Sequence, residues 1–308
     1  MDIEAPTHPI DSRTAAQALV EAAKTAGYAP SIHNTQPWRW RVTGNTLDLH
    51  LVRSRILNAS DPDGRLATLS CGAALHHARV TMAAHGWQIT VARVVQGADR
   101  DLLARLHVHH RSSADPTSAA LLRAIPSRHT DRRAVADTAV DPEALTAIAA
   151  AVESEGTRLH LLRPDQLLDL AAAADLTQHS PVADPAWQAE LMYWTGLAPP
   201  NAGQQGDPPI SARHDKAAVF VMLYGSADEP LNWLRAGEAL SAGWLTAGGR
   251  GVSVMPHSAP TETIATRQAM RAMIAGVGHP YLLLRLGTAD PAGPGAPRLP
   301  TVQIIERY

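Results

Sequence analysis

The sequence feature that most restricts the fold of this chain is a segment that occurs twice. Residues 72–86 align without gaps on residues 237–251. Both copies have the pattern of an apolar helix that ends at a glycine and is followed by a strand. Five of the aligned pairs are identical: Gly72/Gly237, Ala74/Ala239, Leu75/Leu240, Thr81/Thr246 and Gly86/Gly251. Such a repeat suggests two halves of similar structure, although identities among alanine- and glycine-rich positions need support from other motifs.

Periodicity in the rest of the chain predicts an α+β fold. In the first half, residues 1–115, we expect helices at 12–27 and 67–85, a hairpin at 38–51, and strands at 87–95 and 104–110. In the second half, residues 116–308, we expect helices at 141–155, 164–174, 231–248 and 262–275 and strands at 157–162, 217–224, 252–255 and 281–286. Residues 115–127 are interpreted as the junction. The apolar run 217–224 predicts a central strand that is covered on both faces.

A short polar loop lies between the first expected helix and the hairpin, at residues 29–37 (APSIHNTQP). Loops of this kind often present ligand-facing groups. The Ser31 hydroxyl and the Asn34 and Gln36 amides can each donate and accept hydrogen bonds, which suits a flat heterocycle edged with donors and acceptors. The alternative is a helix-terminating loop whose amides cap backbone groups. Composition alone favours that alternative.

Two arginine-containing segments could together bind a dianionic phosphate. They are RHTDR at residues 128–132 and PRLP at residues 297–300. A phosphate in a protein cleft needs fixed positive charge and several hydrogen-bond donors. Lysine occurs only at Lys24 and Lys216, so a phosphate site in this chain must be built from arginine. The alternative for residues 128–132 is a solvated basic turn in which Asp131 is a local counter-ion.

Taken together, these motifs resemble those of a known family. Residues 29–38 read A-P-S-x-x-N-x-Q-P-W, which resembles the signature of the FMN-dependent nitroreductases. Residues 128–132 resemble the R-x-[ST]-x-R element of that family, and residues 297–300 resemble its closing basic element. The resemblance implies that the loop contacts the flavin and that Arg128, Thr130 and Arg298 bind its phosphate and ribityl chain. It also implies that Arg132 approaches the flavin pyrimidine.

Three further positions complete the implied FMN site. By family analogy, Ser253 and Met255 would lie near the N5 edge of the flavin. Arg285 is a charge in an apolar run, and it faces either the phosphate side or an internal carboxylate such as Glu262. The implied cofactor-binding residues are therefore Pro30, Ser31, Ile32, Asn34, Gln36, Arg128, Thr130, Arg132, Ser253, Met255, Arg285 and Arg298.

The order of these motifs differs from that of an ordinary nitroreductase, in which R-x-[ST]-x-R comes first. Here the first half carries the A-P-S-x-x-N loop and the second half carries the arginine elements. The resemblance is therefore to the Acg subfamily, in which one chain imitates a nitroreductase dimer. It implies a nitroreductase-like fold with two repeated halves packed as an intrachain pseudo-dimer, one FMN per chain, and a lid inserted at about 178–214.

The resemblance implies two alternative functions. The first is an oxidoreductase that passes electrons from NAD(P)H through FMN to a flat acceptor such as a nitroaromatic or a quinone, with no dedicated catalytic side chain. The second is a flavin-sequestering, stress-associated protein, because Trp187, Tyr193 and Trp194 of the lid could cover the face where nicotinamide stacks. A structural domain without a cofactor would require all three motifs to be coincidental.

Composition narrows the remaining possibilities. A net charge of −2 argues against a nucleic-acid partner. No apolar run is long enough for a membrane span, and the acidic start is not that of a signal peptide. Cys71 is the only cysteine, which fits a reducing, cytoplasmic compartment. Histidines such as His107, His109 and His110 lack matching metal ligands, so we expect packing roles and no metal. A chain that contains both halves is expected to be a monomer or a weak dimer.

Overall fold

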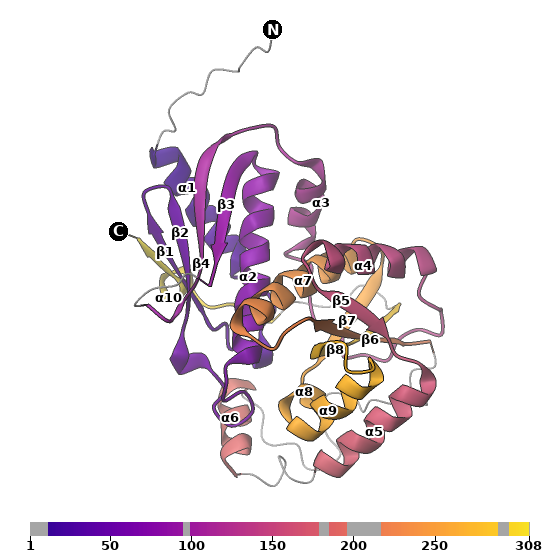
Figure 1. The fold of residues 1–308 in the computed structure, drawn as a ribbon. Helices are drawn as coiled ribbons and strands as arrows, with labels where there is room; N and C mark the ends of the chain where they lie inside the picture. Colours follow the sequence, from indigo (N-terminus) through magenta and orange to yellow (C-terminus); the bar gives the residue numbers. More distant parts are fainter. Residues whose placement is uncertain (1–11, 95–98, 179–184, 196–216, 289–295, 308) are drawn as a thin grey trace.

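The computed structural model of the chain contains two β-sheets with helices packed between and around them (Figure 1). The structure describes residues 12–94, 99–178, 185–195, 217–288 and 296–307. In the described part of the chain, no helix has both the length and the apolar character needed to cross a bilayer.

The first half supplies the first sheet and the two helices that cover it. The helices are α1 (Ser12–Ala26) and α2 (Arg65–Ala84), with short 3-10 turns η1 (Ile32–Asn34) and η2 (Arg53–Arg55). The strands are β1 (Trp38–Thr43), β2 (Thr46–Leu51), β3 (Trp87–Arg93) and β4 (Leu102–Arg111), in the order β3-β4-β2-β1. The predicted hairpin turns at Gly44-Asn45, and Gly44 has the positive φ of 57° that such a turn favours.

The second half supplies the second sheet and the remaining helices. The helices are α3 (Pro116–Ala124), α4 (Pro142–Ser154), α5 (Pro164–Gln178), α6 (Pro185–Thr195), α7 (Pro230–Gly248), α8 (Ala259–Glu262), α9 (Ile264–Met273) and α10 (Thr301–Ile304). The strands are β5 (Arg158–Leu161), β6 (Val219–Gly225), β7 (Val252–His257), β8 (His279–Thr288) and β9 (Ile305–Arg307). Five of these helices begin with proline, whose missing N–H is not needed at the first helical position: α3, α4, α5, α6 and α7.

The strand orders of the two sheets confirm the duplication. The second sheet reads β7-β8-β6-β5, and these strands occupy the positions of β3, β4, β2 and β1 in the first sheet. All three pairings within each set of four are antiparallel. The C-terminal strand β9 leaves the second half and pairs in parallel with β1, so the tail wraps onto the other half as expected. The division of the chain at residue 115 stays a prediction.

The two copies of the repeated segment form α2 and α7, and these helices cross at equivalent glycines. A Cβ atom on Gly72 would lie 1.9 Å from the Leu234 carbonyl oxygen, and one on Gly237 would lie 1.8 Å from the Leu69 carbonyl oxygen. His76 and Ser241, which are also equivalent, bond to each other at 2.9 Å. A residue that contacts its own equivalent is characteristic of a two-fold axis. The halves are therefore related by a pseudo-two-fold axis at this crossing.

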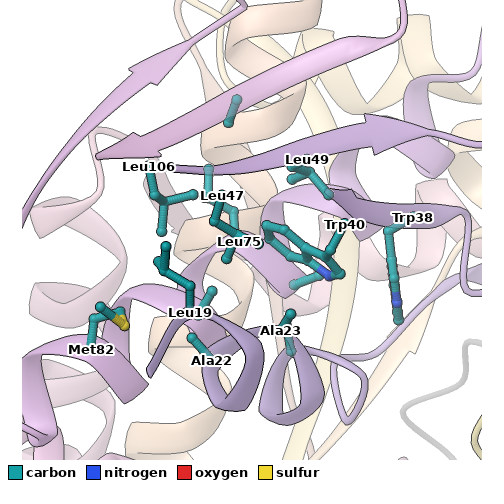
Figure 2. Close-up of a cluster of buried hydrophobic side chains, with 14 of the residues drawn as sticks. Leu19, Ala22, Ala23, Trp38, Trp40, Leu47, Leu49, Leu75, Met82 and Leu106 are labelled. Atoms are coloured by element: carbon teal, nitrogen blue, oxygen red, sulfur yellow. The ribbon is translucent and has the colours of Figure 1, made fainter. Parts of the chain in front are cut away.

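Alternating side chains build a core on each side of the crossing. In the first half, Trp38 and Trp40 of β1 point toward the buried faces of α1 and α2, together with Leu47 and Leu49 of β2 (Figure 2). In the second half, β6 lies inside its sheet and is covered on both faces, as predicted. Val221 and Leu223 pack with α4 and α7. Phe220 and Met222 pack with α5 and α9.

Three sequence expectations were wrong in detail. Residues 115–127 are not only a junction, because Asp115 caps the N-terminus of α3 through bonds from Thr117 and Ser118. The helix expected at 262–275 is two helices, α8 and α9, which Thr263 separates in an extended conformation. The lid segment is not irregular throughout, since it contains α6. The rest of residues 179–214 lies outside the described residues.

Candidate functional site

The loop that follows α1 is held in an unusual backbone conformation. His33, Asn34 and Gln36 have φ values of 42°, 58° and 48°, in the left-handed region that non-glycine residues seldom adopt. The Ser31 hydroxyl accepts a hydrogen bond from the Gln36 backbone N–H at 3.0 Å. The Ile32 amide donates to the Ser70 hydroxyl of α2 at 3.2 Å. These bonds stabilise the strained turn, and such strain is common at binding sites.

The C-terminal tail is hydrogen-bonded directly to this loop. The Asn34 amide nitrogen donates to the Pro297 carbonyl at 2.9 Å, and the Asn34 amide oxygen accepts from the Arg298 guanidinium at 3.0 Å. The Gln36 amide oxygen accepts from the Leu299 backbone N–H at 2.9 Å. The polar side chains of the first half therefore orient the arginine of the second half. Sequence analysis predicted that these segments meet, and the structure brings them together.

Arg128 joins Arg298 at the C-terminal end of α1. Both guanidiniums donate to the Tyr28 carbonyl, Arg298 at 3.0 Å and Arg128 at 3.4 Å. The Arg128 guanidinium also stacks on the Trp244 ring of α7, with 4.5 Å between its central carbon and the ring centroid. Two cations from distant parts of the chain thus share one carbonyl oxygen beside the polar loop.

These two cations are not neutralised by the side chains around them. Among the described residues, neither Arg128 nor Arg298 forms an ion pair, and the buried Nε and Nη1 atoms of Arg128 have no hydrogen-bond partner. Burial, and then the Arg298 charge, lowers the pKa of Arg128 to about 9. The α1 macrodipole offers about half a negative charge against two positive charges. The arrangement therefore has unused donors and uncompensated charge suited to an anion.

The structure places the other predicted residues on β7, on β8, at the start of the polar loop and after α3. Met255 is buried on β7, and the Ser253 hydroxyl donates to the Gly287 carbonyl at 3.0 Å. Arg285 is buried and donates to the Asp131 and Arg133 carbonyls at 3.1 and 2.6 Å, so it anchors the loop that follows Thr130. Pro30 and Thr130 are half-buried, whereas Arg132 is exposed.

Two relatives decide the family. The chain is 36% identical to "Putative NAD(P)H nitroreductase Rv3131" of Mycobacterium tuberculosis, over 97% of this chain and 93% of that protein. It is 32% identical to "Putative NAD(P)H nitroreductase acg" of the same species, over 96% of this chain and 97% of that protein. This chain belongs to the Acg nitroreductase family. It therefore has the nitroreductase-like fold that the motifs predict, with both halves in one polypeptide.

The other comparisons are more distant. No family model matches the chain. The FMN- and NADPH-dependent nitroreductase NfnB from a Sphigopyxis strain is 18% identical, with a TM-score of 0.47 over 60% of this chain and 97% of that chain. NfnB from Mycobacterium smegmatis, solved with NADPH, is 15% identical, with a TM-score of 0.43 over 61% of this chain. The family assignment depends on the two Mycobacterium tuberculosis relatives.

In this Acg-family chain, the position related to the anion site by the pseudo-two-fold axis has a different character. In the repeat alignment, Arg79 of α2 is equivalent to Trp244 of α7. Arg79 bonds to Glu155 and Glu238, each at 2.7 Å, and Arg93 bonds to Glu238 at 2.6 Å. Each cation there has a carboxylate partner. The cations at this position therefore have carboxylate partners, whereas Arg128 and Arg298 at the related position have none among the described residues.

The described part of the lid lies against the polar loop. The Ala59 backbone N–H donates to the two carboxylate oxygens of Glu190 on α6, at 3.4 and 3.2 Å. Trp187 and Glu190 line a small crevice together with His33, Leu57 and Ser60. The lid helix of this Acg-family chain is thus docked on the first half.

Sequence reasoning missed two side chains next to the arginine pair. Trp244 stacks on Arg128, and buried His77 is close enough to both arginines for their charges to lower its pKa. The expected packing role of the histidines gave no reason to single out His77. Its equivalent in the repeat, Ala242, lies two residues before Trp244, but the motif pairs alone carry no information on contacts across the axis. No group of three or more metal-ligating side chains occurs in the described residues.

Proposed function

We propose that this chain is an FMN-dependent NAD(P)H oxidoreductase that reduces a flat acceptor such as a nitroaromatic or a quinone. One FMN would bind per chain, between the two halves. The observation that carries the proposal is the buried guanidinium of Arg128. Its Nε and Nη1 atoms have no hydrogen-bond partner, and the charge of Arg298 beside it is repulsive. A dianionic phosphate would satisfy those donors and offset both charges.

The residues present fit such a cofactor. Arg128 and Arg298 would hold the phosphate, and the Thr130 hydroxyl would add a neutral donor. Asn34 would act as a positioning residue, because both ends of its amide already bond to the tail that carries Arg298. Ser31 would keep the loop in its strained turn. Arg132, Ser253 and Met255 would lie toward the flavin ring, as the family resemblance implies.

The proposed reaction requires no dedicated acid or base among the protein's side chains. FMN, when bound, supplies two-electron transfer between NAD(P)H and an acceptor. The chain would bind and orient the cofactor and control access to it. The membership of the Acg family and the names of the Mycobacterium tuberculosis relatives support this reading.

The experiment is reconstitution with FMN followed by anaerobic reduction. Protein incubated with FMN and then freed of unbound flavin should keep about one flavin per chain, and NADPH should bleach its absorbance. An Arg298→Met variant should retain far less flavin, whereas the exposed Arg250 offers a matched control, and Arg250→Met should behave like the wild type. Colourless wild-type protein after FMN incubation would refute the proposal.

A second candidate function is flavin sequestration behind a closed lid. The docking of α6 on the first half favours it, because Glu190 accepts from the Ala59 N–H and Trp187 lines a crevice with His33 of the polar loop. Wild-type holoprotein would then bleach slowly with NADPH, and Glu190→Ala would accelerate bleaching because the lid helix loses its bonds to the first half. Rapid bleaching in the wild type, unchanged in Glu190→Ala, would exclude sequestration and leave the reductase function.

A further inference from the structure

His77 is a buried polar residue whose ring nitrogens lack hydrogen-bond partners. It lies on α2 with 0% of its surface exposed, and neither ring nitrogen forms a hydrogen bond of good geometry. The Thr25 carbonyl of α1 lies close enough to the ring to act as an acceptor that raises the pKa of His77, an effect smaller than those that lower it. Leaving a buried imidazole unsatisfied destabilises the fold. A packing role alone would be better served by an apolar side chain of similar volume.

The groups that surround His77 are those of the anion site. Arg128 follows α3, Arg298 comes from the C-terminal tail, and Thr25 lies one turn before Tyr28, whose carbonyl both arginines share. His76 is its neighbour on α2, but the His76 ring bonds to Ser241 across the axis. Burial, followed by the charges of Arg128, His76 and Arg298, lowers the pKa of His77 well below its usual value. The imidazole is therefore neutral and carries one N–H donor.

We propose that His77 is a third phosphate-binding group of the FMN site, which donates its ring N–H to a phosphate oxygen held by Arg128 and Arg298. This inference depends on the proposed FMN-binding function and adds to it the selection of FMN over riboflavin. His77 and Arg128 both carry buried nitrogens without a hydrogen-bond partner, and Arg298 donates beside Arg128 to the same Tyr28 carbonyl, so one anion could be bound by all three. A neutral donor adds a hydrogen bond without adding a third positive charge to the ligand-free protein.

The test compares the affinities of FMN and riboflavin, which differ only in the phosphate. Both are measured by quenching of flavin fluorescence in the wild type, His77→Leu, His77→Asn and His76→Asn. A hydrogen bond to a charged group corresponds to roughly a ten- to hundredfold change in affinity. We expect His77→Leu to weaken FMN binding by that factor and to leave riboflavin binding unchanged. His77→Asn, which keeps a donor, should recover part of the loss.

His76→Asn is the matched control, because it alters the adjacent buried histidine on the opposite side of α2. It should preserve the ratio of FMN to riboflavin affinity, even if it lowers the melting temperature. A second measurement uses inorganic phosphate as the probe. Its addition to nitrogen-15-histidine-labelled wild-type protein should shift the His77 ring resonances, and the His77→Leu spectrum should identify them.

The outcomes separate this inference from the function on which it depends. If the wild type prefers FMN to riboflavin and His77→Leu keeps that preference, the role of His77 is refuted while FMN binding stands. Equal losses of FMN and riboflavin affinity in His77→Leu would also refute it, because they indicate a packing role. A wild type that binds neither flavin would refute both.

Discussion

Replacing Arg128 with methionine should stabilise the flavin-free protein and remove the stabilisation that FMN confers. In the folded chain, the pKa of Arg128 is lowered from 12.5 to about 9, first by burial and then by the Arg298 charge. One pKa unit corresponds to about 1.4 kcal/mol, so the charged guanidinium costs the ligand-free fold at most about 5 kcal/mol. Methionine keeps an apolar side chain against Trp244 without that charge.

The net gain is smaller than this limit, because the variant also loses favourable contacts. The stacking on Trp244 and the 3.4 Å bond to the Tyr28 carbonyl contribute together about 2 kcal/mol. We therefore expect the free energy of unfolding to rise by about 1–3 kcal/mol in Arg128→Met without flavin. The pKa is depressed in the folded state, so the cost is present below about pH 9 and declines as the pH rises from 9 toward 12.5. The difference between variant and wild type should decline over the same range.

Urea unfolding with and without FMN measures both effects. At a concentration of FMN about a hundredfold above its Kd, the wild type should gain about 2.7 kcal/mol. Arg128→Met should gain almost nothing, so the stability of the variant relative to the wild type falls by about 2.7 kcal/mol when FMN is added. The exposed Arg250 provides the control, and Arg250→Met should follow the wild type in both conditions. An Arg128→Met protein that is less stable than the wild type without FMN, yet equally stabilised by FMN, would refute the reasoning.

Three further predictions concern the crossing of α2 and α7 and the residues near it. Gly72→Ala should lower the free energy of unfolding by about 3 kcal/mol or more, because its Cβ would meet the Leu234 carbonyl oxygen at 1.9 Å. Gly248→Ala, with no atom within 4 Å of the added Cβ, is its control in urea unfolding, and equal losses would contradict the crossing. Glu238→Gln should cost about 3 kcal/mol by the same measurement, since the half-buried Arg93 loses its carboxylate and Arg79 keeps only Glu155, and a loss within error would argue against the ion network. Cys71, whose burial raises the pKa of its thiol far above the ordinary range, should resist iodoacetamide until the chain unfolds, and rapid labelling of native protein would show that α2 opens.

Much of the fold could be predicted from local signals. The alternation of Trp38, Trp40 and Val42 with polar residues defined β1, and Gly44-Asn45 defined its turn. The capping residue Asp141 before Pro142 marked the start of α4. The same Asp-Pro signal at Asp115-Pro116 lies in the segment that was expected to be a junction, and there it marks the start of α3. Local signals were thus sufficient where a capping residue or a turn marked the end of a helix or strand.

The candidate site could be predicted only in part. Motifs indicated that residues 29–38, 128–132 and 297–300 belong together, and the bonds of Asn34 to the tail agree with that. The carbonyls bound by Arg285 could not be predicted, because they belong to a loop more than 150 residues earlier in the chain. The positions of His77 and Trp244 depend on packing across the axis, which no local sequence pattern predicts. Whether each predicted residue touches FMN stays a prediction.

The glycine crossing gives this chain a freedom that a pair of identical subunits lacks. When two copies of one gene product associate, every substitution occurs on both sides of their contact, so a change that favours one side must also be tolerated on the other. Here Arg79 and Trp244 are encoded separately and have become chemically unlike, one joined to carboxylates and the other stacked under a guanidinium. Covalent linkage has let the two related positions diverge, so that one holds cations without a carboxylate partner and the other holds an ion network between the halves.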